Sequence, residues 1–382
     1  MRINGFLLFI FIFLCTLVLS SIYLPLRYLR YFLPVIPFLF FLSSKKELTL
    51  DMSVFKYYAI FIFMYSCIVL LLFLQNIFFT TLSYRFVPNA IFILSPLLFI
   101  VVGAHYFNKN YIDRYVYLIL LVNIFLFFYE EGSDLLNVLT DLSILKSAFI
   151  TSIIPTESNL AYVFGFLAIY FFITNKNIAL KIIPVIFFFL CFKRIAIVAV
   201  LLCIVLYYVL NYFNVSVAKH RTKLAFLGVL INFLYVRITA MIVSGTFDKL
   251  VMDATGFSTD RFLMGRKQFY TQVFSRAQSN WFGLGLGKVD DIMFDYMKFP
   301  INLHSEVLRV FFEFGVIVFV VWLFVLFYQN LFSNKSAVFL VYFNILILTD
   351  NVFVYFDVMV YFYFFILIFL FQESNKQKSN TI

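Results

Sequence analysis

The chain has little charge for its length. Of its 382 residues only 13% are charged, whereas 64% are hydrophobic and the mean hydropathy is +1.00. This composition excludes a soluble globular protein, because too few polar side chains are available to cover the surface of a domain of this size. Apolar runs of spanning length recur from residue 5 to residue 371. The sequence therefore predicts an all-α polytopic membrane protein.

Cysteine is also scarce and gives no sign of a disulfide framework. The four cysteines, Cys15, Cys67, Cys191 and Cys203, all lie inside apolar runs and lack the spacing of a metal site. The longest polar segment, 246–303, contains no Asp-x-Asp motif of the kind that binds a divalent cation. We therefore expect neither a metal nor a cofactor.

The apolar runs predict about twelve membrane-spanning helices. They lie near residues 5–22, 29–42, 57–79, 88–107, 115–129, 159–174, 179–192, 195–213, 224–245, 304–328, 336–350 and 353–371. The segment 246–303 then separates helices 1–9 (1–245) from helices 10–12 (304–371), and residues 372–382 form a tail. A second long loop is expected at about 130–158, with a helix in its centre that lies along the membrane surface.

Basic residues in the short loops set the predicted orientation. A cytoplasmic N-terminus places fourteen of them inside: Arg2, Lys45, Lys46, Lys56, Lys109, Arg114, Lys176, Lys181, Lys219, Arg221, Lys223, Lys335, Lys376 and Lys378. Six are then outside: Arg27, Arg30, Arg85, Lys146, Lys193 and Arg194. We expect both termini in the cytoplasm and both long loops outside. The net charge of +10 reflects this bias and does not indicate nucleic-acid binding.

Two basic sites lie against the apolar layer, where a charge is costly and points to function. Lys193 and Arg194 form a turn between two apolar runs and are candidates for an anion site; the alternative is a plain connecting loop. Arg237 lies about 20 Å into its span, given the helical rise of about 1.5 Å per residue. It either binds an anion near the outer face or extends to the lipid headgroups.

The segment 258–288 combines cations with a Gly-rich turn. It contains Arg261, Arg266, Lys267 and Arg276, followed by Gly283, Gly285 and Gly287. Guanidinium groups bind phosphate oxygens in a fork, and Gly-rich backbone allows close approach to phosphates. The GLGLG stretch lacks the Lys-Ser/Thr of a P-loop, so the glycines alone are weak evidence.

The stretch NLHSEVLRVFFEFG, 302–315, places a histidine and three charges at the start of a spanning helix. Glu306, Arg309 and Glu313 have spacings of i, i+3 and i+7, so they share one helical face. They either support a site or form a self-neutralised stripe against another helix. His304 is expected in the turn that precedes the helix, where a neutral imidazole can act as a base; the alternative is a structural histidine.

Taken in order, these motifs resemble those of the bacterial O-antigen polymerase and ligase superfamily. GRKQFY is similar to its Gly-Arg-x-x-x-Trp motif, with Tyr270 in place of Trp, and WFGLGLG is similar to its Gly-x-Gly turn. LHSEVLRVFFEFG is similar to His-Asn-x-x-Leu followed by Glu-x-Gly, with Ser305 in place of Asn, and KRIAIV is similar to its outer basic turn.

The resemblance implies a GT-C-like, metal-independent glycosyltransferase of the inner membrane with its active site facing the periplasm. The donor and the acceptor would be oligosaccharide on undecaprenyl pyrophosphate, and a chain-length regulator is a possible partner alongside membrane lipids. His304 would be the catalytic base. The pyrophosphate-binding residues would be Arg194, Arg266, Arg261, Lys193 and Arg237, with Glu306, Arg309, Glu313, Tyr270, Gly283 and Gly285 in supporting roles.

Three alternatives to the polymerase stay open at this point. A ligase that transfers polysaccharide to lipid A-core would use the same chemistry. A flippase or other transporter would carry charges along a path through both leaflets and internal repeats, whereas here the charges gather near one side and no repeat is evident. A scaffolding protein would have no need of arginines and a histidine at the membrane boundary.

Overall fold

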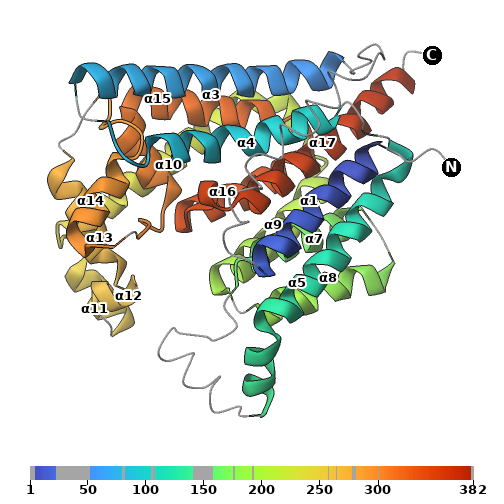
Figure 1. The fold of residues 1–382 in the computed structure, drawn as a ribbon, viewed down its shortest axis with the longest axis horizontal. Helices are drawn as coiled ribbons and strands as arrows, with labels where there is room; N and C mark the ends of the chain where they lie inside the picture. Colours follow the sequence, from blue (N-terminus) through green and yellow to red (C-terminus); the bar gives the residue numbers. More distant parts are fainter. Residues whose placement is uncertain are drawn as a thin grey trace.

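The computed structural model describes most of the chain, and the part it describes is helical (Figure 1). The described residues are 5–22, 52–79, 82–104, 107, 109–140, 158–174, 177–191, 193–256, 258–263, 265–277, 281–299 and 301–379. Within them no strand is present. The prediction of an all-α fold is therefore confirmed.

The apolar helices follow the predicted spans closely. They are α1 (Gly5–Ile22), α3 (Met52–Phe79), α4 (Phe86–Ala104), α5 (Ile112–Thr140), α7 (Leu160–Ile173), α8 (Ile178–Leu190), α9 (Arg194–Tyr212), α10 (Arg221–Val243), α15 (Glu306–Asn330), α16 (Asn334–Thr349) and α17 (Phe356–Ser379). Six of the described helices are long and apolar enough to cross a membrane, and five further apolar helices are shorter. The predicted span 29–42 lies outside the described residues, so the count of twelve is not confirmed.

The structure differs from the expected outer loop at 130–158. Helix α5 continues to Thr140, because the apolar spacing persists past the charged EEGSD segment and Leu135 still packs into the core. The predicted surface helix, at the centre of that loop, otherwise falls in 141–157, outside the described residues.

Helix α7 lies at the centre of the bundle. All but one of its fourteen residues are buried, as expected for a helix that is apolar on every side. It packs against α8, α9, α16 and α17. By contrast α9 and α10 expose rows of large apolar side chains such as Leu201, Val205, Phe226 and Leu230, which is the surface a lipid bilayer would cover.

Four short polar helices gather at one end of the bundle, at the lower left of Figure 1. They are α11 (Asp248–Thr255), α12 (Thr259–Phe262), α13 (Arg266–Arg276) and α14 (Lys288–Met297). Helix α13 packs on α10 and α14, and α14 packs on α15. The described part of the segment 246–303, expected as one long loop, thus forms a helical layer packed against α10 and α15.

Helix α15 is broken at Gly315, and the Gly-rich turn fills the break. Gly315 has φ 75° and ψ 168°, so the carbonyls of the preceding turn lose their helical donors. Leu284 N donates to Phe312 O at 2.8 Å, and Gly285 N donates to Glu313 O at 3.0 Å. These amides are used inside the protein, so the turn serves packing here.

We expect Gly283→Ala to destabilise the fold. Gly283 has φ 78°, and a Cβ built there would lie 2.4 Å from both Glu313 O and Gly315 N. Left-handed strain alone costs about 1–3 kcal/mol, and neither backbone atom can move freely. Thermal unfolding of the purified protein in detergent would show a lower midpoint. Gly132→Ala is the matched control, because a Cβ there meets nothing within 4 Å; an equal midpoint for both variants would contradict the role of the break.

Candidate functional site

His304 lies in a strained turn directly before α15. Its φ is 57°, a left-handed value that a non-glycine residue adopts rarely and mostly where the surroundings hold it. The next residue, Ser305, is the N-cap of α15, and its hydroxyl accepts a hydrogen bond from Leu308 N at 3.3 Å. Serine thus supplies the cap that Asn supplies equally well. The prediction that His304 belongs to the entrance turn is confirmed.

Asp350 joins this turn to the rest of the bundle. It follows α16, and its side chain is 3.5 Å (Oδ1) from His304 Nδ1 and 3.0 Å (Oδ2) from Lys193 Nζ. Tyr162 donates its hydroxyl to Oδ2 at 2.5 Å, and Tyr355 donates to Oδ1 at 3.4 Å. Its backbone carbonyl accepts from Glu306 N at 3.1 Å. The carboxylate of Asp350 therefore joins α7 to the residues that immediately precede α9, α15 and α17.

The surroundings keep Asp350 charged. Burial by itself would raise the pKa of this carboxyl, but the hydrogen bond with His304, the Lys193 ammonium and the Tyr162 hydroxyl together hold the pKa well below its usual range. Burial and the neighbouring Asp350 raise the pKa of Tyr355, which keeps that phenol protonated as a donor. The pair of His304 and Asp350 is thus an imidazole beside a fixed negative charge.

Two of the predicted cations lie beside this pair. Lys193 is the N-cap residue of α9; its Nζ also donates to Asn159 Oδ1 at 2.7 Å and lies 4.4 Å from the centre of the Tyr162 ring. Arg266, the first residue of α13, donates from Nη1 to Thr349 O at 3.1 Å, one residue before Asp350. The structure therefore brings Lys193 and Arg266 to the same turn as His304.

The other predicted phosphate ligands are placed less directly. Arg194 is the exposed first residue of α9, next to Lys193. Arg237 is exposed on α10, away from the buried face of that helix, a position that suits extension toward headgroups. Arg261 lies in α12, and its side chain falls outside the described part of the structure.

The hydroxyl groups of Tyr270 and Tyr235 form hydrogen bonds with residues in and beside the His304 turn. Tyr270 is buried on α13 and donates its hydroxyl to His304 O at 3.4 Å. Tyr235 on α10 donates to Leu348 O at 2.7 Å and lies 3.3 Å from Ser305 Oγ. Burial raises the pKa of Tyr270, so its hydroxyl stays protonated and can only be used as a hydrogen-bonding group. Tyr270 thus fits the supporting role expected of it.

The charged face of α15 is entirely buried. Glu306, Arg309 and Glu313 are at most 2% exposed, and Arg309 Nη2 lies 2.5 Å from Glu306 Oε1. Glu306 Oε2 accepts from Phe353 N, and Glu313 Oε1 accepts from Val289 N. The charged face therefore ties α15 to α14 and to the segment after Asp350, as the supporting role requires.

Asp350 is the residue that the sequence reasoning missed. It ends a predicted span within the polar triplet Thr-Asp-Asn at 349–351, and the rule applied to the other charges, that an ionisable group against the apolar layer marks a site, covers it equally. Asn159 and Tyr162 are uncharged, so that rule does not cover them; the stretch IPTESNLAY that contains them is loosely similar to the Asn-Pro-Asn loop of the superfamily.

The fold and this site define a polytopic helical membrane protein with a histidine–carboxylate pair and two cations at one end of its bundle. Among the described residues no three His, Cys, Asp or Glu side chains are grouped to hold a metal ion. Residues 179–323 match the family model described as O-antigen ligase, which confirms the resemblance to the O-antigen polymerase and ligase superfamily. No curated protein and no solved structure matches the chain.

The match supports a function of the O-antigen ligase or polymerase type. The matched segment contains Lys193, Arg266 and His304 but ends before Asp350. The structure thus places a residue from beyond the matched segment at the centre of the candidate site.

We expect Asp350→Asn to destabilise the protein at neutral pH. The variant leaves Lys193 and His304 beside a buried position without its charge, and removal of one partner of a buried pair costs about 3–5 kcal/mol. Because the folded pKa of Asp350 is depressed, its contribution is present above the unfolded pKa of about 3.9 and is lost as pH falls below it.

Thermal unfolding at pH 7 and at lower pH values checks this expectation. The wild-type midpoint should fall more steeply with acid than that of Asp350→Asn. Asp253→Asn, an exposed position on α11, should behave as the wild type. Parallel acid profiles for wild type and Asp350→Asn would contradict the assignment.

Proposed function

We propose that this protein is a polymerase of lipid-linked oligosaccharide at the periplasmic face of the inner membrane, with His304 as the catalytic base. The observation that carries the proposal is the pairing of His304 with Asp350 beside Lys193 and Arg266. A base and a set of cations on one turn is what glycosyl transfer from a pyrophosphate requires.

The proposed reaction divides these residues into two groups. Asp350 faces Nδ1 of His304 and leaves Nε2 for the acceptor hydroxyl. As the hydroxyl oxygen attacks the anomeric carbon, its proton moves to Nε2, and Asp350 stabilises the imidazolium that forms. The bond from the anomeric carbon to the pyrophosphate oxygen breaks with its electron pair. Arg266 and Lys193 are placed to stabilise that negative charge, with Arg194 as a further cation on the same turn.

Contacts of buried side chains hold the His304 turn in place. The Phe353 N–H bond to Glu306 and the Tyr270 bond to His304 O tie the turn and the start of α15 to neighbouring segments, and the ion pair of Arg309 with Glu306 lies within α15. A base must lie within hydrogen-bond reach of the proton it takes, so a rigid turn favours the proposed role.

A ligase is the second candidate, because the matching family model is described as O-antigen ligase. It would use the same base and cations with a different acceptor. The two functions differ in product: a polymerase given only lipid-linked repeat units makes a ladder of lengths, whereas a ligase requires lipid A-core and adds one polysaccharide chain to it.

We expect wild-type protein, in detergent with EDTA and lipid-linked repeat units, to produce such a ladder on a gel. His304→Ala should lose about 10²- to 10⁴-fold in rate, as for removal of a general base, and Arg266→Ala should also lose activity. If the protein forms no ladder from repeat units but adds glycan to lipid A-core, the ligase would be favoured.

His220→Ala is the matched control for this experiment, because His220 is an exposed histidine immediately before α10. It should form the same ladder as the wild type. A normal rate for a folded His304→Ala protein would refute the catalytic role of that residue, and a ladder that the wild type forms only when EDTA is left out would refute metal independence.

A further inference from the structure

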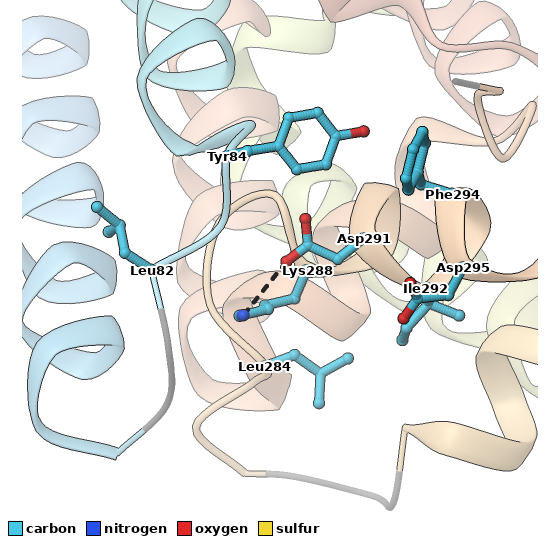
Figure 2. A pocket seen from close by; sticks show the side chains of 8 residues that line it. All are labelled: Leu82, Tyr84, Leu284, Lys288, Asp291, Ile292, Phe294 and Asp295. Carbon is cyan, nitrogen blue, oxygen red and sulfur yellow. Dashed lines mark ion pairs between the residues drawn. The ribbon is translucent and has the colours of Figure 1, made fainter. Parts of the chain in front are cut away.

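A cavity of about 740 Å³ lies between the α3–α4 turn and α14 (Figure 2), and His304 is not among its lining residues. Its lining residues are Leu82, Tyr84, Leu284, Lys288, Asp291, Ile292, Phe294 and Asp295. The volume falls within the range of about 300–1,000 Å³ that is typical of small-molecule sites. Leu82, Tyr84 and Phe294 are exposed, so the cavity opens to the surface.

The aromatic wall of this cavity is built from two elements. The Tyr84 and Phe294 rings meet edge to face, with centroids 5.8 Å apart at 64°, and Figure 2 shows both on the same side of the space. Ser83 holds the turn against α14, because its hydroxyl donates to Gly287 O at 3.0 Å and lies 2.7 Å from Asp291 Oδ1. The wall is therefore preformed.

Two carboxylates and one ammonium supply the polar groups. Lys288 Nζ lies 3.2 Å from Asp291 Oδ2, whereas Asp295 is exposed one turn further along α14. The Arg85 guanidinium lies 5.3 Å from the centre of the Tyr84 ring, so with Lys288 two cations balance the two carboxylates. Neither sign of charge dominates, and the hydrogen-bond acceptors of the cavity are its two carboxylates. They favour a ligand rich in hydroxyl donors, because an ionised carboxylate accepts hydrogen bonds only.

We propose that this cavity is a saccharide subsite that binds the glycan of the lipid-linked substrate away from the bond that reacts. A pyranose has a C–H face that packs on aromatic rings and an edge of hydroxyls that carboxylates accept. The inference rests on the proposed function. It extends that function by assigning neutral or amino sugars, not the pyrophosphate or the lipid tail, to this cavity.

The location supports the assignment. In the chain, α14 is followed by residues 301–303 and then by His304. The Gly-rich turn before α14 is hydrogen-bonded to the break in α15. The cavity and the His304 turn thus lie on the same folded layer at one end of the bundle. A glycan bound at the cavity would be held while one of its ends is at the reaction site.

The test measures binding without turnover. The probe is the oligosaccharide released by mild acid from the cell's own lipid-linked glycan and freed of lipid and phosphate, titrated calorimetrically into detergent-purified protein. Wild type should bind it, and Phe294→Ala and Asp295→Asn should each weaken binding about tenfold, as the loss of one good contact implies. Undecaprenyl pyrophosphate, as a second probe, should bind both variants like the wild type.

Matched controls come from the same layer. Tyr296→Ala removes an aromatic residue of α14 that is 37% exposed, against 38% for Phe294, but does not line the cavity. Asp253→Asn removes an exposed carboxylate from α11. Both should bind the oligosaccharide normally. Equal binding by wild type and Phe294→Ala, or no binding by wild type, would overturn the subsite, and weaker binding of undecaprenyl pyrophosphate by Phe294→Ala would reassign the cavity to lipid phosphate.

The same proteins separate this inference from the proposed function. If the wild type forms a ladder, and Phe294→Ala and Asp295→Asn bind oligosaccharide and form the ladder equally well, only the subsite proposal fails. If the wild type binds oligosaccharide through Phe294 but forms no ladder, the polymerase proposal fails and the subsite stands.

Discussion

The candidate site depends on the ion pairs and hydrogen bonds of the Asp350 carboxylate. In an apolar bundle a buried charge persists only when other groups compensate it, and here Lys193, His304, Tyr162 and Tyr355 do so from several parts of the chain. The same contacts fix the position of the imidazole. Compensation of one buried charge and orientation of the His304 imidazole are thus achieved by a single set of contacts.

The broken helix α15 is the second constraint. A continuous helix would satisfy its own carbonyls, whereas the break at Gly315 leaves them to the amides of Leu284 and Gly285. The polar layer of α11–α14 is therefore hydrogen-bonded directly to a spanning helix. Non-helical backbone in a spanning helix is tolerated where protein surrounds it, and here it couples the polar layer to the helix that begins beside His304.

Two sets of polar residues with different chemistry lie at this end of the bundle. Around His304 the cations Lys193 and Arg266 accompany a fixed carboxylate, which suits a developing anion. Around Tyr84 and Phe294 two carboxylates are balanced by Lys288 and Arg85, and aromatic rings form the wall, which suits hydroxyl-rich sugar. A lipid-linked glycan carries both chemistries in one molecule, so the two sets fit different parts of the same substrate.

The sequence by itself determined the class of protein and most helices, because apolar length and period are local properties. It also singled out His304 and the charges of α15, which stand at the start of an apolar run, and Arg266, which lies in a polar segment with further cations and a Gly-rich turn. Only the tertiary structure decided which of these groups meet. The pairing of His304 with Asp350, 46 residues later in the chain, and the choice of Lys193 as their contact depend on which helix ends lie together. The role of the GLGLG turn likewise follows from the break in α15 that it fills, a contact between distant segments that no local pattern encodes.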